Sequence, residues 1–426
     1  MNLTPEQETI GRRNFLKALA GTPALAALGA AAAVKGPVRG GPVKVGFIGI
    51  GAQGRVLLTN TDPAYADVRA LCDINPASLA KADDVIAKKK APPARHYVEW
   101  RDMLEHEDLE AIITAVPLWM HAEVVCGCLD AGKHVLCEKM MAWDLAGCER
   151  MLRAAERNGR VLEIGYQRWY NPIYQAAYEG VVKAGLLGDV YHTRLVWHRN
   201  QNWRRPGDPP SADYDASKWG YPTWDHLWNW RLYWRYSQGL VAELASHQLN
   251  VANWFFDSSP IEVQASGGLY RYKDGRREVY DHVYATFEYP GGRNAVFTSI
   301  ESNAFDQRYE AFMGTKGTLI LRNETEALLF DEGAGNRATG IEVSAKTGGA
   351  ALDASESRAA DATSTSRSVA PGTVDRPSAT RQEISRFCEA VRVHRPIACG
   401  PERAMHSARA CILANQAIEK KTYLRV

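Results

Sequence analysis

The chain has 426 residues, of which 46% are hydrophobic and 23% charged, so it is long enough for two domains and apolar enough to bury a core. Its formal net charge of +2 provides no basic face for nucleic acid and no polybasic patch for an acidic membrane surface. The 8 cysteines are too sparse for a disulfide framework, and no histidine or second cysteine pair completes a zinc pattern around Cys126 and Cys128. We therefore expect neither a nucleic-acid partner nor a metal.

Residues 1–34 have the pattern of an export signal. Arg12 and Arg13 are followed by Phe-Leu-Lys and then by an Ala/Leu/Gly run that ends near Ala33. A charged start, an apolar stretch and small residues are the parts of a cleavable signal, and the paired arginines resemble a bacterial twin-arginine signal. We predict export by the twin-arginine machinery, to the periplasm or beyond. The alternatives are an amphipathic helix that stays attached and, since the apolar run is short for a spanning helix, less favourably a retained anchor.

A Gly/Pro linker over residues 35–42 leads into a region, residues 43–165, in which apolar strands alternate with helices. Strands that alternate with helices at this spacing predict a parallel sheet with right-handed crossovers, an α/β Rossmann domain. The predicted strands cover residues 43–49, 68–73, 111–116, 133–137 and 160–164, and the first helix covers residues 52–60.

Three glycines, Gly49, Gly51 and Gly54, form a Gly-x-Gly-x-x-Gly pattern between the first strand and the first helix. The first permits a tight turn, the second lets a pyrophosphate approach the backbone, and the third allows close packing of helix on strand. The free amides at the helix start, where Ala52 and Gln53 lie, would face the phosphates. Asp73 ends the next strand, where its carboxylate can bind ribose hydroxyls and would repel a 2′-phosphate. The sequence therefore favours NAD over NADP.

Residues 166–426 are predicted to form an α+β domain with a predominantly antiparallel open sheet. Strands are expected over residues 261–265, 279–288 and 294–300, with turns at 289–292 and 314–317 and helices over 381–393 and 401–420. Between about residues 331 and 380 the chain is rich in Ala, Ser, Thr and Gly, the composition of a solvated insertion.

Further motifs follow the predicted strands of the first domain, where ligands bind in parallel sheets. They are Thr114-x-x-Pro117-x-x-x-His121, Glu138-Lys139 and Gly165-Tyr166-Gln167-Arg168. Together with the glycine turn, in this order and spacing, these motifs resemble the Gfo/Idh/MocA oxidoreductase family. The resemblance covers nearly all of the chain after the signal and is strongest over residues 43–168. The family's usual Glu-Lys-Pro is Glu-Lys-Met here.

The resemblance implies a set of residues that contact the cofactor: Gly49, Gly51, Ala52, Gln53, Gly54, Asp73, Thr114, Pro117, His121, Glu138, Lys139 and Gln167. It also implies that Lys139 lies near the nicotinamide and the substrate hydroxyl, where it would polarise the reacting oxygen. Relatives are typically dimers or tetramers that associate through the open face of the antiparallel sheet, so we expect a homo-oligomer.

Residues 239–250 resemble the family's Asp-x-x-x-His-x-x-Asp segment. On a helix, Glu243 and His247 would lie one turn apart on the same side, and a carboxylate beside an imidazole holds its tautomer and can raise its pKa. The resemblance assigns His247 the hydroxyl proton, whereas the spacing alone also fits a structural pair. Asn250 stands where an Asp is frequent. Glu243 and His247 as metal ligands would need a third ligand, and we find none.

The stretch between residues 190 and 254 is crowded with Trp, Tyr and Arg. Indole rings stack on the C–H faces of sugars and Arg binds hydroxyls, although some of these tryptophans must be core. We predict that two or three line a carbohydrate pocket, with Trp230 and Arg231 the first candidates. Tyr166, Arg168 and Asn250 are further candidates for substrate binding.

These observations predict hydride transfer between a tightly bound NAD and a secondary hydroxyl of a sugar, an inositol or a sugar derivative. Free NAD is scarce outside the cytoplasm, so export favours a bound cofactor. Two alternatives stay open. One is an NAD-dependent glycoside hydrolase that acts by transient oxidation and elimination, as some relatives do. The other is a non-catalytic dinucleotide- or sugar-binding sensor, against which the presence of Lys139 and His247 counts.

Overall fold

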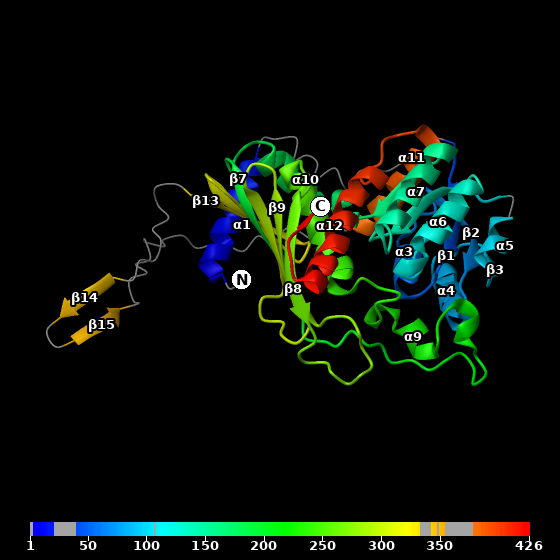
Figure 1. Ribbon diagram of the computed structural model, residues 1–426. Helices are drawn as coiled ribbons and strands as arrows, with labels where there is room; N and C mark the ends of the chain where they lie inside the picture. The colour runs from blue at the N-terminus through cyan, green and yellow to red at the C-terminus, as the bar shows by residue number, and fades with distance from the viewer. Residues whose placement is uncertain (1–2, 21–39, 106–107, 333–341, 347–348, 354–377) are drawn as a thin grey trace.

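The computed structural model describes residues 3–20, 40–105, 108–332, 342–346, 349–353 and 378–426. These residues form a Rossmann domain beside a second domain built on a large sheet, and a small hairpin stands apart from both (Figure 1). The fold class predicted from the sequence is thereby confirmed. No described helix is long and apolar enough to cross a membrane.

The first domain has a six-stranded parallel sheet in the order β3-β2-β1-β4-β5-β6. Its strands are β1 (Val43–Ile48), β2 (Ala66–Cys72), β3 (Arg95–Tyr97), β4 (Ala111–Thr114), β5 (His134–Glu138) and β6 (Leu162–Gly165). The helices between them are α3 (Ala52–Asn60), α4 (Pro76–Lys88), α5 (Trp100–Leu104), α6 (His121–Asp130) and α7 (Leu145–Asn158). The strand order reverses beside β1, and such a switch point opens a crevice at the carboxyl ends of the strands where ligands bind.

The second domain has an eight-stranded sheet in the order β13-β12-β11-β7-β10-β9-β8-β16. Its pairs are antiparallel except for β7 with β10, so the sheet is mixed, though mostly antiparallel as predicted. The strands are β7 (Val190–His198), β8 (Glu262–Gly268), β9 (His282–Tyr289), β10 (Arg293–Ile300), β11 (Arg308–Gly314), β12 (Gly317–Arg322), β13 (Glu326–Asp331) and β16 (Leu424–Arg425).

Helices α10 (Ser246–Phe256) and α12 (Pro401–Lys420) pack on this sheet and on each other, and α12 also packs against α7 of the first domain. Helix α10 follows directly on a π-helical turn, η6 (Val241–Ala245). The other short helices are η1 (Leu118–Met120), η2 (Gln167–Tyr170), α8 (Pro172–Ala177), η3 (Tyr178–Val182), η4 (Ala216–Trp219), α9 (Trp224–Trp228) and η5 (Trp230–Leu232).

Helix α11 (Ala379–Val393) lies in the predicted second domain by sequence but packs against the Rossmann sheet. Its Ile384, Phe387 and Cys388 share one apolar core with β1, β4 and α3. Arg392 fastens its end by pairing with Glu110 and donating to the main chain of residues 41 and 42. The chain therefore returns to its first domain near its end, which the division at residue 166 did not anticipate.

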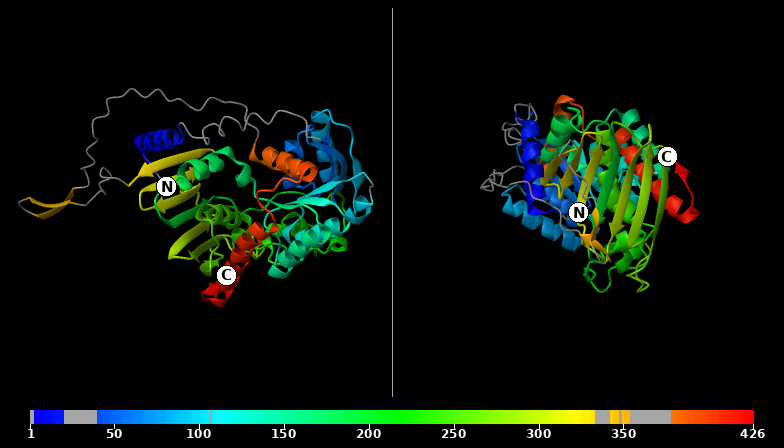
Figure 2. Two further views of the ribbon diagram at one scale, coloured as in Figure 1. Left: turned by 90° about the horizontal axis from the view of Figure 1, so that it is seen from above. Right: turned by 90° about the vertical axis from the view of Figure 1, so that its left-hand side faces the viewer.

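Helix α1 (Pro5–Leu19) is docked on the second domain at β13 (Figure 2). Thr4 and Gln7 form a capping box at its start, and Phe15 and Leu19 are buried in the main core. In the structure, residues 5–19 are thus packed on the fold, whereas the sequence placed residues 1–34 outside it. Residues 21–34 lie outside the described residues, and twin-arginine export stays a prediction.

Most of the low-complexity insertion predicted at about residues 331–380 lies outside the described residues. Within it the structure describes two paired strands, β14 (Glu342–Lys346) and β15 (Gly349–Asp353). They form the hairpin that stands away from both domains in Figure 1.

Candidate active site

The turn between β1 and α3 has the geometry of a dinucleotide cradle. Gly49 has φ +83°, and a Cβ there would lie 2.8 Å from the carbonyl carbon of Ala115. A Cβ on Gly54 would lie 2.0 Å from the Gly49 carbonyl oxygen, so helix and turn approach too closely for a side chain. Gly51 has no neighbouring atom within 4 Å of the same position, which leaves open space above the helix start. The residues of this turn therefore fit a bound pyrophosphate.

A cavity of about 600 Å³ extends from this turn along the domain boundary. Its lining combines the predicted cofactor residues Gly49, Gly51, Ala52, Gln53, Asp73 and Pro117 with the predicted substrate residues Trp230 and Arg231. The structure thus brings parts of the two predicted sites together in one pocket, whose lining does not include Lys139 or His247. Among the described residues no group of three or more His, Cys, Asp or Glu side chains could hold a metal ion.

Asp73 supports the glycine turn from below. Its Oδ2 accepts a hydrogen bond from the Ile50 amide at 2.7 Å, and its Oδ1 accepts one from the Asn75 amide at 2.7 Å. Burial raises the pKa of Asp73 to about 6, and the two amide bonds act against that rise. Each carboxylate oxygen keeps a second lone pair, which is what a ribose hydroxyl requires.

Two of the predicted cofactor motifs are joined by a direct hydrogen bond. The Gln53 side-chain amide donates to Glu138 Oε1 at 2.7 Å, and the Lys139 amide donates to Glu138 Oε2 at 3.2 Å. Burial raises the pKa of Glu138. The bond fixes the end of β5, and hence the start of the Lys139 side chain, relative to the glycine turn.

Lys139 reaches across the domain boundary to Glu243. Its Nζ donates to the Glu243 carbonyl oxygen at 3.0 Å and lies 3.7 Å from Glu243 Oε2. Arg231 Nε donates to the same Oε2 at 3.1 Å, and the Arg231 guanidinium lies 4.2 Å from the centroid of the Trp230 ring. Burial alone would raise the pKa of Glu243, but Lys139 and Arg231 outweigh it, so the pKa lies below its usual value. Glu243 is therefore a carboxylate held between two cations.

His247 is buried without a carboxylate beside it. The Tyr166 ring lies edge-on to it, with ring centroids 6.1 Å apart, and the Trp197 ring lies at 5.9 Å. Burial, followed by the positive charges of Lys139 and Arg168, lowers the pKa of His247 well below its usual value. Among the described residues no group hydrogen-bonds its Nδ1. His247 is thus a neutral imidazole at neutral pH, as a general base must be.

The predicted Glu243–His247 pair is wrong. The Glu243 carboxylate pairs instead with Lys139 and Arg231, which lie on other elements, and leaves His247 without an acidic partner in the part of the chain that the structure describes. A carboxylate beside His247 would have raised its pKa, but burial and the nearby positive charges lower it.

Two predicted cofactor residues lie beneath the pocket rather than in its lining. Thr114 is fully buried at the end of β4. His121 is also buried, with Nδ1 2.8 Å from the Met140 carbonyl oxygen and Nε2 3.1 Å from that of Val116. The His121 ring therefore joins the turns after β4 and β5, since both ring nitrogens are engaged there. The Lys139–Met140 peptide bond at this place is cis.

Two predicted substrate residues are likewise buried by distant partners. Arg168 is 1% exposed and pairs with Glu310 and Glu324. Asn250 accepts from the Trp169 indole at 2.7 Å and donates to Ser407 at 3.0 Å. Their assignment to substrate is wrong, because these contacts occupy their polar groups inside the core.

The remaining candidates lie around His247 and after β6. The Tyr166 side chain is buried, and its ring packs edge-on against the His247 imidazole. Tyr166 therefore does not face the pocket. Gln167 is half-buried at the start of η2.

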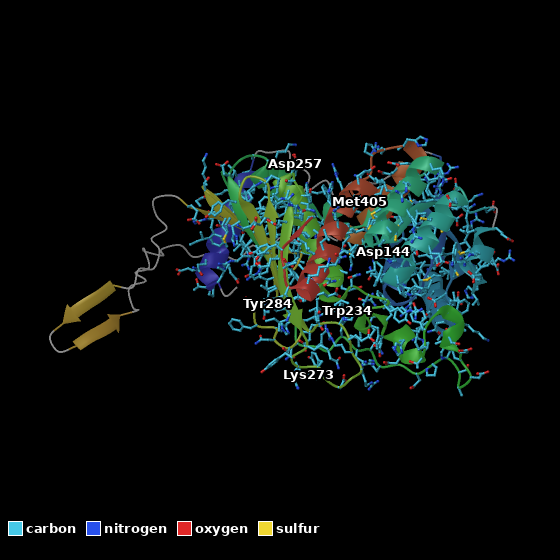
Figure 3. The ribbon with its side chains drawn as sticks, viewed as in Figure 1. Asp144, Trp234, Asp257, Lys273, Tyr284 and Met405 are labelled. Atoms are coloured by element: carbon cyan, nitrogen blue, oxygen red, sulfur yellow. The ribbon has the colours of Figure 1, made fainter. Side chains whose placement is uncertain are left out.

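Sequence reasoning missed Trp119, Tyr221 and Arg205, which also line the cavity. Trp119 stands inside the Thr114–His121 motif, so its large aromatic ring at a strand end was a usable signal. Tyr221 and Arg205 lie in the aromatic stretch that the sequence identified only as a whole. In Figure 3, Trp234 of the same stretch lies between the large sheet and the Rossmann domain, and its carbonyl accepts from the Trp143 indole at 3.0 Å.

A glycine-turn Rossmann domain joined to an open sheet domain, with a lysine, a buried histidine and the pocket at their boundary, defines a dinucleotide-dependent oxidoreductase. Residues 43–166 match the "Oxidoreductase family, NAD-binding Rossmann fold", and residues 176–320 match the "GFO/IDH/MocA C-terminal domain". The two matches together span more than half of the chain, which therefore belongs to the Gfo/Idh/MocA family of oxidoreductases.

Among its relatives, the myo-inositol 2-dehydrogenase of Thermotoga maritima is 24% identical over 296 residues, 68% of this chain and 79% of that protein. A glycosyl hydrolase family 109 protein of Shewanella baltica is 26% identical over 210 residues, 47% of this chain and 44% of that protein. The scyllo-inositol dehydrogenase structure from Lactobacillus casei with NAD(H) and scyllo-inositol has a TM-score of 0.63 at 19% identity, covering 90% of this chain and 99% of that one. This last likeness supports the fold.

Proposed function

We propose that the protein is an NAD-dependent dehydrogenase of a secondary hydroxyl in a sugar, an inositol or a related cyclic polyol. The observation that carries the proposal is the neutral, buried His247 near the Lys139 ammonium group, which lies beyond the glycine-turn pocket. The inositol dehydrogenases among the relatives support this substrate class. When bound, NAD exchanges a hydride with the carbon that carries the hydroxyl.

The chain's own residues supply the proton chemistry. The neutral imidazole of His247 accepts the proton of the substrate hydroxyl during oxidation and returns it during reduction. The Lys139 ammonium group donates a hydrogen bond to the reacting oxygen and stabilises the negative charge that develops on it. Glu243 and Arg231 position Lys139, because the carboxylate holds both cations at one place.

The pocket lining provides recognition and cofactor choice. Trp230 offers an aromatic face and Arg231 a guanidinium group, which suit the C–H faces and hydroxyls of a sugar ring. Asp73 disfavours a 2′-phosphate, which supports NAD rather than NADP.

A denaturation assay followed by substrate assays tests the proposal. The purified protein is unfolded and released NAD is quantified, and the NAD-loaded enzyme is then given inositols, aldoses and aryl glycosides. We expect NADH formation with a cyclic polyol or sugar. Aryl glycoside cleavage without net NADH would replace the dehydrogenase by the glycosidase alternative, and NAD binding without any turnover would replace it by a sensor.

We also propose export by the twin-arginine route and a homo-oligomer formed through the large sheet. Arg12 and Arg13, followed by an apolar run, support export. The open sheet face carries exposed side chains such as Tyr284, labelled in Figure 3, which is 42% exposed. Cell fractionation of the wild type and an Arg12→Lys, Arg13→Lys variant tests the first proposal, and light scattering of the purified protein tests the second.

A further inference from the structure

One segment of the second domain, which we call the strap, lies over the cofactor pocket. The strap comprises residues 202–238 and contains η4, α9 and η5. It leaves the large sheet after β7 and returns just before η6, which carries Glu243. In Figure 1 the strap's α9 lies on the side of the molecule where the Rossmann domain is, away from the large sheet. The strap packs its own core, formed by Ala216, Tyr221, Leu227, Leu232, Tyr233 and Tyr236 with Val279.

Near its end the strap is bonded to Trp143 of the Rossmann domain through the Trp234 carbonyl and the Gln238 side chain. Beside the pocket it is fastened to the Rossmann domain at two further places. The Tyr214 hydroxyl donates to the Ile74 carbonyl oxygen at 3.1 Å, directly after Asp73. The Trp119 indole donates to the Tyr221 hydroxyl at 2.7 Å, and the two rings meet edge-on with centroids 5.7 Å apart. Ile74 and Trp119 also pack against the strap's apolar core. Both contacts thus attach the strap to loops that follow strands of the parallel sheet.

The two fastened loops bound the cavity that the glycine turn opens. On one side the lining comes from Gly51, Asp73 and their neighbours, and on the other it comes from the strap. The strap's contribution includes Arg205, Trp219, Tyr221, Trp228 and Trp230. A dinucleotide that lies on the glycine turn is therefore covered by the strap on its opposite side.

The start of the strap, at Asn202, is held by a buried ion pair outside it. Arg277 is buried, pairs with Glu301 and donates to the Asn202 carbonyl oxygen at 3.2 Å. Farther along, the Arg205 amide donates to Asn229 Oδ1 at 2.7 Å, so two parts of the strap are linked to each other. The strap is consequently fixed at its base, and its hold on the two loops that bound the pocket rests on the Tyr214 and Tyr221 contacts.

We propose that the strap retains bound NAD, with Tyr214 and the Trp119–Tyr221 pair as its latch, so that the cofactor stays in place between turnovers. The inference rests on the proposed function, in which the pocket holds NAD. Tyr214 and Tyr221 are positioning residues in this scheme, because they act by holding the strap closed. The cofactor leaves only when the contacts of Tyr214 and Tyr221 to the loops that bound the pocket open.

The test is the dissociation rate of NADH from Tyr214→Phe, Tyr221→Phe and the double variant. Each change removes one hydroxyl and keeps the ring. Protein loaded with NADH is mixed with excess NAD, and the loss of bound-NADH fluorescence gives the rate. We expect on the order of tenfold faster release in the double variant and loss of copurified cofactor on gel filtration, as for one or two lost hydrogen bonds. Tyr270→Phe is the matched control, since Tyr270 is 78% exposed and should release NADH like the wild type.

Hydrogen exchange gives a second measurement that needs no variant. Backbone amides of residues 214–222 should exchange more slowly in the NAD-loaded wild type than in the apoprotein. Equal release rates in the wild type and the double variant, or equal exchange with and without NAD, would overturn the latch and leave the proposed function standing. A wild type that binds no NADH at all would overturn the proposed function itself.

Discussion

The ammonium group of Lys139 is held by two oxygens of a single residue, Glu243, on the opposite domain. A cation so placed can turn to a substrate oxygen with little rearrangement, and removing it also leaves Glu243 with Arg231 as its remaining ion-pair partner. The positive charge of Lys139 stabilises the transition state more than the bound substrate, because the reacting oxygen becomes more negative as its proton leaves.

Replacing Lys139 by methionine should therefore lower kcat by about 10²–10⁴-fold, the range for a positioned proton-transfer or oxyanion-stabilising group. Steady-state kinetics on a cyclic polyol, with the NAD content of the same preparation measured after denaturation, checks this. Lys316→Met in the exposed turn between β11 and β12 is the matched control and should keep the wild-type kcat. A Lys139→Met enzyme with wild-type kcat would remove Lys139 from the mechanism.

The neutral state of His247 has a consequence for the pH profile. A base with a depressed pKa becomes protonated only at acid pH, so oxidation by the wild type should not lose activity to His247 protonation between about pH 8 and 6. His247→Gln should lower kcat across this whole range, by about 10²–10⁴-fold. A wild-type profile that falls with a midpoint at the ordinary histidine pKa, and that is abolished in the variant, would contradict the neutral base.

At the scale of elements, strand β6 carries a carboxyl group, that of Glu163, which has a tyrosine hydroxyl as its hydrogen-bond partner and no cation among the described residues paired with it. Glu163 is fully buried, its Oε1 accepts from the Tyr170 hydroxyl, and burial raises its pKa to about 8. In the unfolded chain the same group ionises near 4.5. Folding therefore takes up a proton between these two values, and the stabilisation present at pH below 4.5 is lost as the pH rises towards 8.

Glu163→Gln should consequently flatten the dependence of the unfolding free energy on pH. Between these two pH values Glu163 contributes about 1.4 kcal/mol per pH unit to the slope of the unfolding free energy against pH. The variant loses this contribution, because a glutamine takes up no proton on folding. Urea unfolding at about pH 5.5 and 7.5 measures the slope in both proteins. Glu383, also buried and with a raised pKa, keeps its own contribution in both. Glu156→Gln on the exposed face of α7 should leave the slope unchanged, and an equal slope for Glu163→Gln would show that Glu163 is ionised in the fold.

The elements that could be predicted are those specified by local pattern. Strands such as β1 and β4 are short, mostly apolar runs bounded by turns, and Gly54 meets the Gly49 carbonyl oxygen, which the motif itself brings close. The predictions failed where residues distant in the sequence decide the contacts of a side chain. Arg168 is buried by Glu310 and Glu324, and Glu243 pairs with Lys139 rather than with His247; all three of these ion-pair partners are more than a hundred residues away. Spacing along the chain contains no information of this kind.

At the scale of the whole molecule, α1 closes the free edge of the eight-stranded sheet. Strand β13 is the first strand in that sheet, and α1 packs on it. Phe15 and Leu19 join the main core, while a Cβ on Gly11 would meet the Phe330 ring at 2.7 Å. Arg12 pairs with Glu326 of the same strand. An edge strand left uncovered is a template for association with another chain, so α1 protects the sheet as well as adding to its core.

Removing residues 1–20, by processing or by truncation, should therefore change association more than stability. Burying Phe15 and Leu19 contributes about 1.5–3 kcal/mol each, and the backbone entropy of ordering a helix of this length opposes that gain, so the net loss on truncation is small. Without α1, however, Leu328 and Phe330 of β13 lose their cover, and the edge of the eight-stranded sheet exposes apolar side chains.

We expect a thermal midpoint within a few degrees of the full-length value and, by light scattering at increasing concentration, a larger mass than the full-length protein has. Phe330→Lys in the truncated chain is the matched test of cause and should restore the smaller mass, because a charge on an edge strand opposes pairing. If full-length and truncated chains had the same mass at every concentration, the edge would be closed by something other than α1. In that case the docked helix would matter for the core alone.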